Sequence, residues 1–111
     1  MAIMREYYVY ILASKRNGTL YTGMTENLGK RVVRHKDRSA NQFAAKYDVK
    51  KLVYYEKHVS LEDAVKREKQ VKKWRREWKI QLIEKRNSEW EDLFGEIIKT
   101  KISGSPVAKP R

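Results

Sequence analysis

Two stretches near the N-terminus are dense in aromatic and β-branched residues and predict paired strands. The first is EYYVYILA, residues 6–13, and the second is TLYTGMT, residues 19–25. The polar, glycine-ended link SKRNG joins them, so the pair is predicted to form a β-hairpin. The run KLVYYEKHV at residues 51–59 predicts a further strand, and the strands together predict a small three-stranded sheet.

A short and very basic helix is predicted directly after the hairpin. Asn27 is a favourable N-cap for the run LGKRVVRHKDR, which begins at Leu28. Leu28, Val32 and His35 recur along one side of this run, and basic residues surround the rest. The segment NQFAAKYD, residues 41–48, is predicted to add a helical turn or two before the third strand.

A longer helical region follows the third strand. Ser60 with Asp63 three residues later is a capping-box signal, and it predicts a helix over about residues 61–74. Nothing in the following RREWKIQLIEKRN breaks helical character, so a second helix or a bent continuation is predicted to reach about Arg86. SEWEDL then offers one last capped turn, through Phe94.

The length and the final segment define the domain organisation. A chain of 111 residues suffices for one domain with a modest core. We expect an α+β fold in which helices flank a small three-stranded antiparallel sheet, and we assign residues 1–98 to it. Residues 99–111 are KTKISGSPVAKPR, a segment that is rich in Lys, Ser, Gly and Pro and has few apolar side chains to bury. This tail is predicted to be disordered.

The charge balance points to a partner. Lys and Arg total 26 against 14 Asp and Glu, which gives a formal net charge of +12. Such a field favours a polyanion: nucleic acid first, an anionic membrane surface second, an acidic protein third. No stretch approaches the run of about 20 apolar residues that a spanning helix needs, and no signal-peptide pattern is present. The cytoplasm is therefore the expected compartment. The count of 0 cysteines excludes disulfides and thiolate metal sites, which fits that compartment.

An acid interrupts the apolar stripe of the most basic predicted helix. In AVKREKQVKKW, Glu68 lies between Val65 and Val71 and above Ala64, at about 100° per residue. A buried ionised carboxylate costs several kcal/mol, as a rough guide, unless it is paired or binds a cation. Glu68 is therefore either the partner of a nearby Lys or Arg, which is the commoner case, or a ligand of a divalent metal ion.

Tyr10 and Tyr21 are predicted to share one face of the hairpin, and the loop length decides whether they meet. A loop of four residues, 14–17, puts Tyr10 directly opposite Tyr21. A two-residue Asn-Gly turn instead separates them by roughly 13 Å along the strand. Gly23 lies on the same face and would leave a gap in the side-chain layer through which a backbone or a phosphate could approach.

Arg31 and His35 share a face of the first predicted helix because they are four residues apart. Taken singly, each has an ordinary interpretation, Arg31 as cover for the edge of the core and His35 as a half-buried histidine. Together with Tyr10, Tyr21 and Glu68 they supply an acid/base candidate, a phosphate clamp and a hard-metal ligand. The combination is unusual in a chain whose charge already favours a polyanion.

As a set, these motifs resemble the GIY-YIG endonuclease superfamily, and specifically its small single-domain members related to the N-terminal nuclease domain of the bacterial excision-repair incision subunit. YVY at residues 8–10 looks like the first motif and YTG at residues 21–23 like the second. In TENLGKR the family's Asn-Leu precedes Arg31, and His35 matches the family's frequent histidine one helical turn later. AVKREKQVKKWRREWKIQLI is similar to the family's third-helix signature, which places its metal-binding glutamate on Glu68.

The resemblance covers about residues 7–93 and departs from the name-giving motifs at two positions. Tyr8 stands where the first motif has Gly, and Thr22 stands where the second has Ile. Both positions are tolerant of change in the small branch of the family. Asn87 is a candidate match to a late asparagine of the family.

The resemblance implies a metal-dependent endonuclease that hydrolyses nucleic-acid phosphodiester bonds, with DNA favoured over RNA. It implies one divalent ion, Mg²⁺ or Mn²⁺, on Glu68, while Arg31 neutralises transition-state charge. The general base is Tyr10, Tyr21 or His35, three alternatives that the sequence leaves open. The candidate nucleic-acid contacts are basic side chains on two predicted helices: Lys30, Arg34, Lys66, Lys69, Lys72 and Lys73.

The main alternative keeps the fold and drops the catalysis, which gives a basic nucleic-acid-binding module for DNA or RNA. A binder of anionic membranes or acidic proteins would leave the co-occurrence of Tyr10, Tyr21, Arg31 and Glu68 as coincidence. We therefore expect nucleic acid and no membrane as the partner. Nothing in the sequence favours one oligomeric state.

Overall fold

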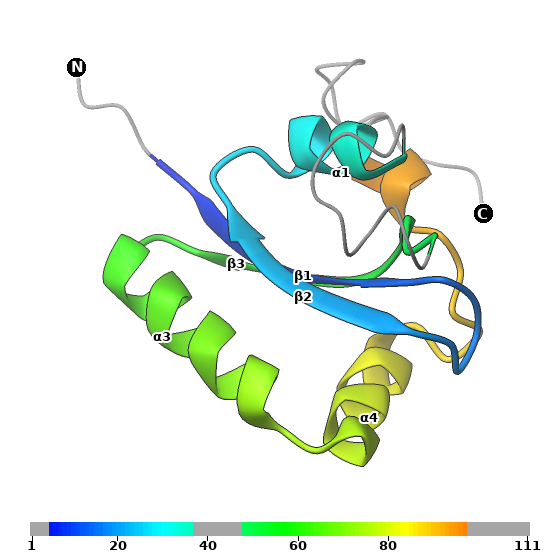
Figure 1. The fold of residues 1–111 in the computed structure, drawn as a ribbon. Coiled ribbons are helices and arrows are strands. Elements are labelled where there is room, and N and C mark those ends of the chain that lie inside the picture. The colour runs from blue at the N-terminus through cyan, green and yellow to red at the C-terminus, as the bar shows by residue number, and fades with distance from the viewer. Residues whose placement is uncertain (1–4, 37–47, 98–111) are drawn as a thin grey trace.

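A computed structural model describes residues 5–36 and 48–97. Its three-stranded sheet consists of β1 (Tyr7–Ala13), β2 (Leu20–Thr25) and β3 (Lys51–His58). β1 lies in the centre and runs antiparallel to both neighbours (Figure 1). The predicted three-stranded antiparallel sheet is confirmed.

Helices cover both faces of the sheet. α1 (Leu28–Lys36) lies on one face, and α3 (Leu61–Lys73) and α4 (Arg76–Arg86) lie on the other (Figure 1). α3 packs against all the strands, and α4 packs against β3. The predicted α+β class with flanking helices is therefore confirmed. Among the described residues, no helix has the length and the apolar character needed to cross a membrane.

Side-chain caps fix where α1 and α3 begin. The Lys30 backbone N–H donates to Asn27 Oδ1 at 3.0 Å, and the Asp63 backbone N–H donates to Ser60 Oγ at 3.2 Å. Each bond satisfies an N–H group that has no partner inside its own helix. Both helices start where the capping pattern predicts.

A break at residues 74–75 separates α3 from α4, so the alternative of a distinct second helix is the one found. Trp74 and Arg75 both adopt extended backbone, with ψ of 151° and 158°. Residues 94–97 form a final helical turn. Residues 41–47 of the turn predicted over residues 41–48 lie outside the described residues, as does the predicted tail 99–111.

The loop of the hairpin holds four residues, one position later than predicted. The Ser14 backbone N–H donates to Thr19 O at 3.0 Å, and Ser14 Oγ accepts from the Thr19 N–H at 3.0 Å. Inside this pair, the Gly18 N–H donates to Lys15 O at 2.8 Å. Asn17 takes a positive φ of 59°, which asparagine tolerates better than most residues. Because the Ser14 hydroxyl binds Thr19, Ser14 pairs within the hairpin and does not belong to the loop.

This loop sets a register that differs from both expected ones. Tyr10 pairs with Gly23, and Tyr21 pairs with Leu12. Tyr10 and Tyr21 are therefore diagonal neighbours on one face, which still allows long aromatic side chains to touch. The prediction that they stand directly opposite each other is wrong.

The described residues form three buried clusters, and the smallest joins Tyr7 and Val9 of β1 to Ala64 of α3. On the α1 face, Tyr10, Leu12 and Leu52 pack with Leu28 and Val32 of the helix. The opposite face buries a larger apolar set against α3 and α4: Ile11, Ala13, Val53, Tyr54, Val71, Ile83 and Trp90. Tyr10 thus belongs to the core under α1 as well as to the candidate site.

Candidate active site

Tyr10, Tyr21 and His35 form a compact group under α1, which we call the aromatic cluster. The ring centroids of Tyr10 and Tyr21 lie 6.3 Å apart, and the imidazole centroid lies 6.0 Å and 5.1 Å from them, respectively. Tyr10 Oη lies 3.3 Å from His35 Nε2. Tyr10 and His35 are buried, while Tyr21 is partly exposed. The strand pair supplies the tyrosines, and α1 supplies the histidine.

Gly23 makes room for the Tyr10 phenol. A Cβ atom at Gly23 would lie 2.5 Å from Tyr10 Oη and 2.7 Å from its Cζ, closer than such atoms pack. The expected gap opposite Tyr10 is therefore filled by the phenol, and the prediction that a backbone or a phosphate approaches there is wrong. The missing side chain lets the ring lie across β2 toward His35.

Gly23→Ala is expected to lower the cleavage rate by at least about tenfold, since misplacing a catalytic group by about 1 Å can cost about 100-fold. The added methyl would push the buried phenol away from His35 Nε2. Gly95→Ala is the matched control, because a Cβ at Gly95 meets nothing within 4 Å. Single-turnover rates of both variants test this, with melting temperatures as a check on folding. Equal rates in the two variants would contradict the role given to Gly23.

Burial keeps both hydrogen-bonded groups of the cluster neutral near pH 7. It raises the pKa of Tyr10, the neighbouring Tyr21 raises it further, and the charge of Arg31 opposes the rise. Burial, together with the charges of Arg31 and Arg34, lowers the pKa of His35 to about 4. His35 Nδ1 is also buried and has no hydrogen-bond partner among the described residues. A neutral phenol thus faces a neutral imidazole.

Arg31 lies beside the aromatic cluster on α1 and is partly buried. Its charge acts on both Tyr10 and His35, as their shifted pKa values show. Within the described residues, no carboxylate forms an ion pair with Arg31. Its side chain hydrogen-bonds to Tyr10. A guanidinium has five N–H donors, so it can also bind a phosphate oxygen.

Glu68 lies on α3, on the opposite face of the sheet from α1. Its side chain is only 18% exposed, and its charge contributes to the raised pKa of Tyr10. Lys72 Nζ lies 2.9 Å from Glu68 Oε2, one helical turn away. The ion pair that the sequence offered as the commoner alternative is thus present, and a metal ion would have to displace the ammonium group.

Glu68 fits a magnesium-type ion as one ligand of several. In the described part of the chain, no group of three His, Cys, Asp or Glu side chains is placed to hold a metal. Mg²⁺ commonly binds through one or two carboxylates and completes its shell with water and substrate phosphate. A single hard oxygen donor beside a cationic surface is compatible with that requirement.

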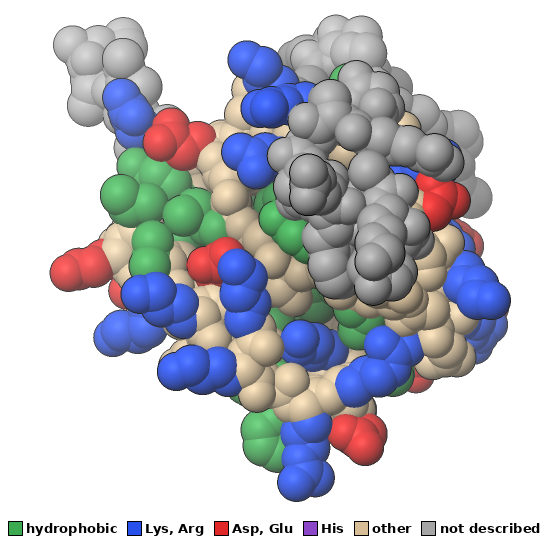
Figure 2. Space-filling view, viewed as in Figure 1, with side chains coloured by type: hydrophobic (Ala, Val, Ile, Leu, Met, Phe, Trp, Pro, Cys, Tyr) green, Lys and Arg blue, Asp and Glu red, His purple; other side chains and the backbone are tan. Residues whose placement is uncertain are grey.

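The six predicted nucleic-acid contacts are exposed, on α1 and α3. Figure 2 shows Lys and Arg side chains gathered over this side of the molecule, from α1 down to the end of α3. Two further cations on α4, Arg76 and Lys79, are not among the predicted contacts. Burial lowers the pKa of Lys79, and the nearby charges of Arg76 and Lys72 lower it further. The signal was their spacing of three residues, one turn beyond Lys73.

Asn87, the candidate late asparagine, has its side chain bound to backbone. Its Nδ2 donates to Val53 O at 3.0 Å and to Glu91 O at 2.9 Å, and its Oδ1 accepts from the Glu91 N–H at 3.0 Å. Asn87 is also buried. The residue joins the end of α4 to β3, and we do not include it in the candidate site.

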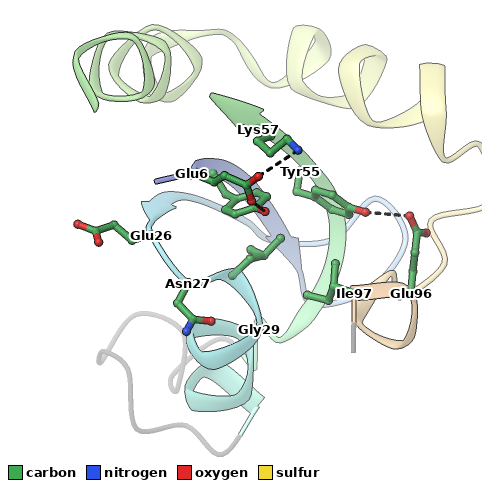
Figure 3. A pocket seen from close by; sticks show the side chains of 10 residues that line it. Glu6, Glu26, Asn27, Gly29, Tyr55, Lys57, Glu96 and Ile97 are labelled. Atoms are coloured by element: carbon green, nitrogen blue, oxygen red, sulfur yellow. Dashed lines mark hydrogen bonds and ion pairs between the residues drawn. The ribbon is translucent and has the colours of Figure 1, made fainter. Parts of the chain in front are cut away.

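A separate pocket of about 420 Å³ lies beside the N-terminus of α1 (Figure 3). Glu6, Glu26 and Glu96 line it, and Lys57 lies 3.3 Å from Glu6. The Tyr55 hydroxyl donates to Glu96 at 2.8 Å. Carboxylates repel phosphate, so a nucleic-acid backbone is expected over the cationic surface and not in this pocket.

A comparison with protein-family models identifies the family of this chain. The family model for the GIY-YIG catalytic domain matches residues 6–81. The chain therefore belongs to the GIY-YIG family, which is a family of nucleases, and the predicted membership is confirmed.

Within this family, the chain is similar to small single-domain proteins named UPF0213. One from Syntrophus aciditrophicus (strain SB) is 43% identical over 90 residues, which cover 78% of this chain and 98% of the relative. One from Clostridium perfringens is 38% identical over 90 residues, or 81% of this chain and 96% of the relative. The solution NMR structure of UPF0213 protein BH0048 from Bacillus halodurans aligns with a TM-score of 0.50 at 29% identity, over 78% of this chain and 92% of that one.

Proposed function

We propose that this protein is a metal-dependent endonuclease that hydrolyses phosphodiester bonds, with DNA as the favoured substrate. The observation that carries the proposal is the convergence of the aromatic cluster, Arg31 and Glu68 beside a cationic surface in a GIY-YIG domain. An acid/base pair, a phosphate clamp and a metal ligand are the groups that this hydrolysis needs.

Arg31 is assigned to the scissile phosphate. A phosphodiester gains negative charge as water attacks, and a guanidinium held in place stabilises that charge more in the transition state than in the ground state. Arg31 acts on both Tyr10 and His35, so a phosphate bound to it would lie next to the proton-transfer groups. When bound at Glu68, a divalent ion supplies Lewis-acid stabilisation of the phosphate and of the leaving 3′ oxygen.

Tyr10 and His35 are assigned to the proton. A phenol with a raised pKa is a poor base by itself, and prior formation of its phenolate is unfavourable. A relay avoids the phenolate: Tyr10 Oη takes a proton from the attacking water as its own proton passes to His35 Nε2, 3.3 Å away. The growing negative charge on the phosphate favours the imidazolium that results. Tyr21, whose ring packs on both, orients them.

Labelled duplex, single-stranded, flap and RNA substrates, each incubated with Mg²⁺, Mn²⁺ or EDTA, test the proposal. Cleavage that requires Mg²⁺ or Mn²⁺ would support it, and the panel would identify the substrate. Binding to these substrates with no cleavage under any condition would favour the non-catalytic binding module. Failure to bind any of them would overturn both functions.

Binding to duplex DNA is expected to weaken steeply with salt, with a slope of log affinity on log salt of about −3 or steeper, because each phosphate contact contributes about −0.9. Replacing both Lys69 and Lys73 with Gln should make the slope less steep by up to about 2. Lys57→Gln is the control, because Lys57 pairs with Glu6 beside the acidic pocket and should leave the slope unchanged. Titrations at several salt concentrations measure it, and a flat response in the wild type would contradict nucleic-acid binding.

A further inference from the structure

A shallow aromatic groove lies at the corner between α3 and α4. Trp74 and Trp78 line it with Gln81, Leu82 and Lys85, around a volume of about 330 Å³. The two indoles meet edge to face, with ring centroids 6.1 Å apart. Exposed hydrophobic side chains lie beside basic ones and an acidic one at this lower corner in Figure 2. We call these five residues the tryptophan groove.

The groove is fixed to the fold by one indole and open to solvent at the other. Trp74 packs against the core cluster that includes Val71 and Ile83. Trp78 is 49% exposed, although the chain buries Trp90 completely. Large aromatic side chains left at a surface commonly mark binding sites, because tryptophan contributes strongly when a partner covers it.

The residues of α4 in the groove form one stripe along the helix. Trp78, Gln81, Leu82 and Lys85 follow the spacing i, i+3, i+4 and i+7. Ile83, on the other side of α4, is buried in the core. Leu82 also packs against the core cluster, whereas Trp78, Gln81 and Lys85 are exposed. These three present an indole, an amide and an ammonium group on the solvent side of the stripe.

Cations surround both indoles. The Arg75 guanidinium lies 5.7 Å from the Trp78 ring centroid, and the Arg67 guanidinium lies 5.1 Å from that of Trp74. No carboxylate is among the five residues that line the groove. Arg67 is held by Glu56 at 2.8 Å, whereas no described carboxylate forms an ion pair with Arg75. An apolar protein segment would gain little from these cations, but a flat π-system joined to phosphates matches both features.

We propose that the tryptophan groove binds an unstacked base of a single-stranded segment of the nucleic-acid substrate, with Arg75 and Lys85 on the flanking phosphates. The proposal rests on the proposed function. Trp74 follows Glu68 by six residues, roughly 9 Å along the axis of a helix. Lys72 and Lys73 lie between them, so a strand that leaves the candidate active site can cross the end of α3 over positive charge (Figure 1).

Trp78→Ala tests the proposal through binding to a single-stranded oligonucleotide and to the duplex of the same sequence. We expect the single-strand affinity to fall by about fivefold or more, the effect of losing one base stack on an aromatic ring. The duplex affinity should change by less than about twofold, because paired bases do not reach the groove. Trp78→Phe, which keeps a stacking ring, should restore most of the loss. Leu61→Ala is the matched control, because Leu61 is also 49% exposed and lies at the other end of α3.

A second measurement reports on the groove without any cleavage. The oligonucleotide should quench tryptophan fluorescence, and Trp78→Phe should remove most of that quenching. Equal loss of single-strand and duplex affinity in Trp78→Ala, or no loss in either, would overturn the proposal. So would a Trp78→Ala variant that loses only self-association in sedimentation, since the groove would then belong to a second copy of the chain. If the wild type binds and cleaves nucleic acid and Trp78→Ala behaves identically, only the role of the groove is refuted. If the wild type binds no nucleic acid, the proposed function itself is refuted.

Discussion

Glu68→Gln is expected to reduce cleavage to the level seen with EDTA while nucleic-acid affinity stays within about threefold of the wild type. The substitution keeps the shape of the side chain and removes the charge that a divalent ion requires. It also releases Lys72 from its ion pair, so the cationic surface loses nothing. Single-turnover cleavage in Mg²⁺ and filter binding in EDTA measure the two effects. Calorimetric titration with Mn²⁺ should show the loss of metal binding directly.

Glu62→Gln is the control for this result, since Glu62 lies exposed in the first turn of the same helix. The Glu68–Lys72 pair is half exposed on the lysine side, so its loss should cost at most about 1 kcal/mol of stability. A Glu68→Gln protein that cleaves normally would show that this carboxylate binds no metal. One that unfolds would show that its role is structural.

Tyr10→Phe is expected to lower the cleavage rate by about 100-fold or more, the usual scale for the loss of a general base. The phenyl ring still fills the space over Gly23, so the fold and substrate binding should be preserved. Tyr21→Phe keeps its packing on the imidazole and should have a smaller effect. His35→Ala should match the loss in Tyr10→Phe, and the double variant should be little worse than either, because both act in one relay.

Rates of the single and double variants at saturating substrate decide between the mechanisms. Near wild-type rates in both phenylalanine variants, together with an inactive His35→Ala, would make His35 the base and remove Tyr10 from the chemistry. Fully multiplicative losses in the double variant would separate the two residues into independent roles.

The sequence predicted the strands and the helix starts because those signals are local. Aromatic and β-branched residues define β1, and the caps at Asn27 and Ser60 make their hydrogen bonds within three residues. The register of the hairpin was less accessible, because it depends on one bond between the Ser14 hydroxyl and the Thr19 N–H. A shift of one position in the loop was enough to place Gly23 opposite Tyr10.

The residues of the candidate site could be predicted from residue type and spacing, but the contacts between them could not. Glu68 stood out because it interrupts an apolar stripe, whereas its pairing with Lys72 depends on which of many cations is within reach. Lys79 was not among the predicted contacts, although Lys72, Arg76 and Lys79 follow the spacing i, i+4 and i+7. The break at residues 74–75 interrupts that helix, so periodicity alone does not show that the three stay close together.

The hydrogen bonds of Arg76 affect how the molecule unfolds locally. One of its terminal nitrogens donates to Asn17 O and to Gly18 O, each at 2.7 Å, and so ties the first turn of α4 to the tip of the hairpin. Local unfolding proceeds in cooperative units whose boundaries follow such contacts. We therefore expect the hairpin tip and the α3–α4 corner to open together, and hydrogen exchange of amide protons in both segments measures this. A chain with 0 cysteines thus couples the strand that carries Tyr21 to the helical region that carries Glu68 without any covalent cross-link.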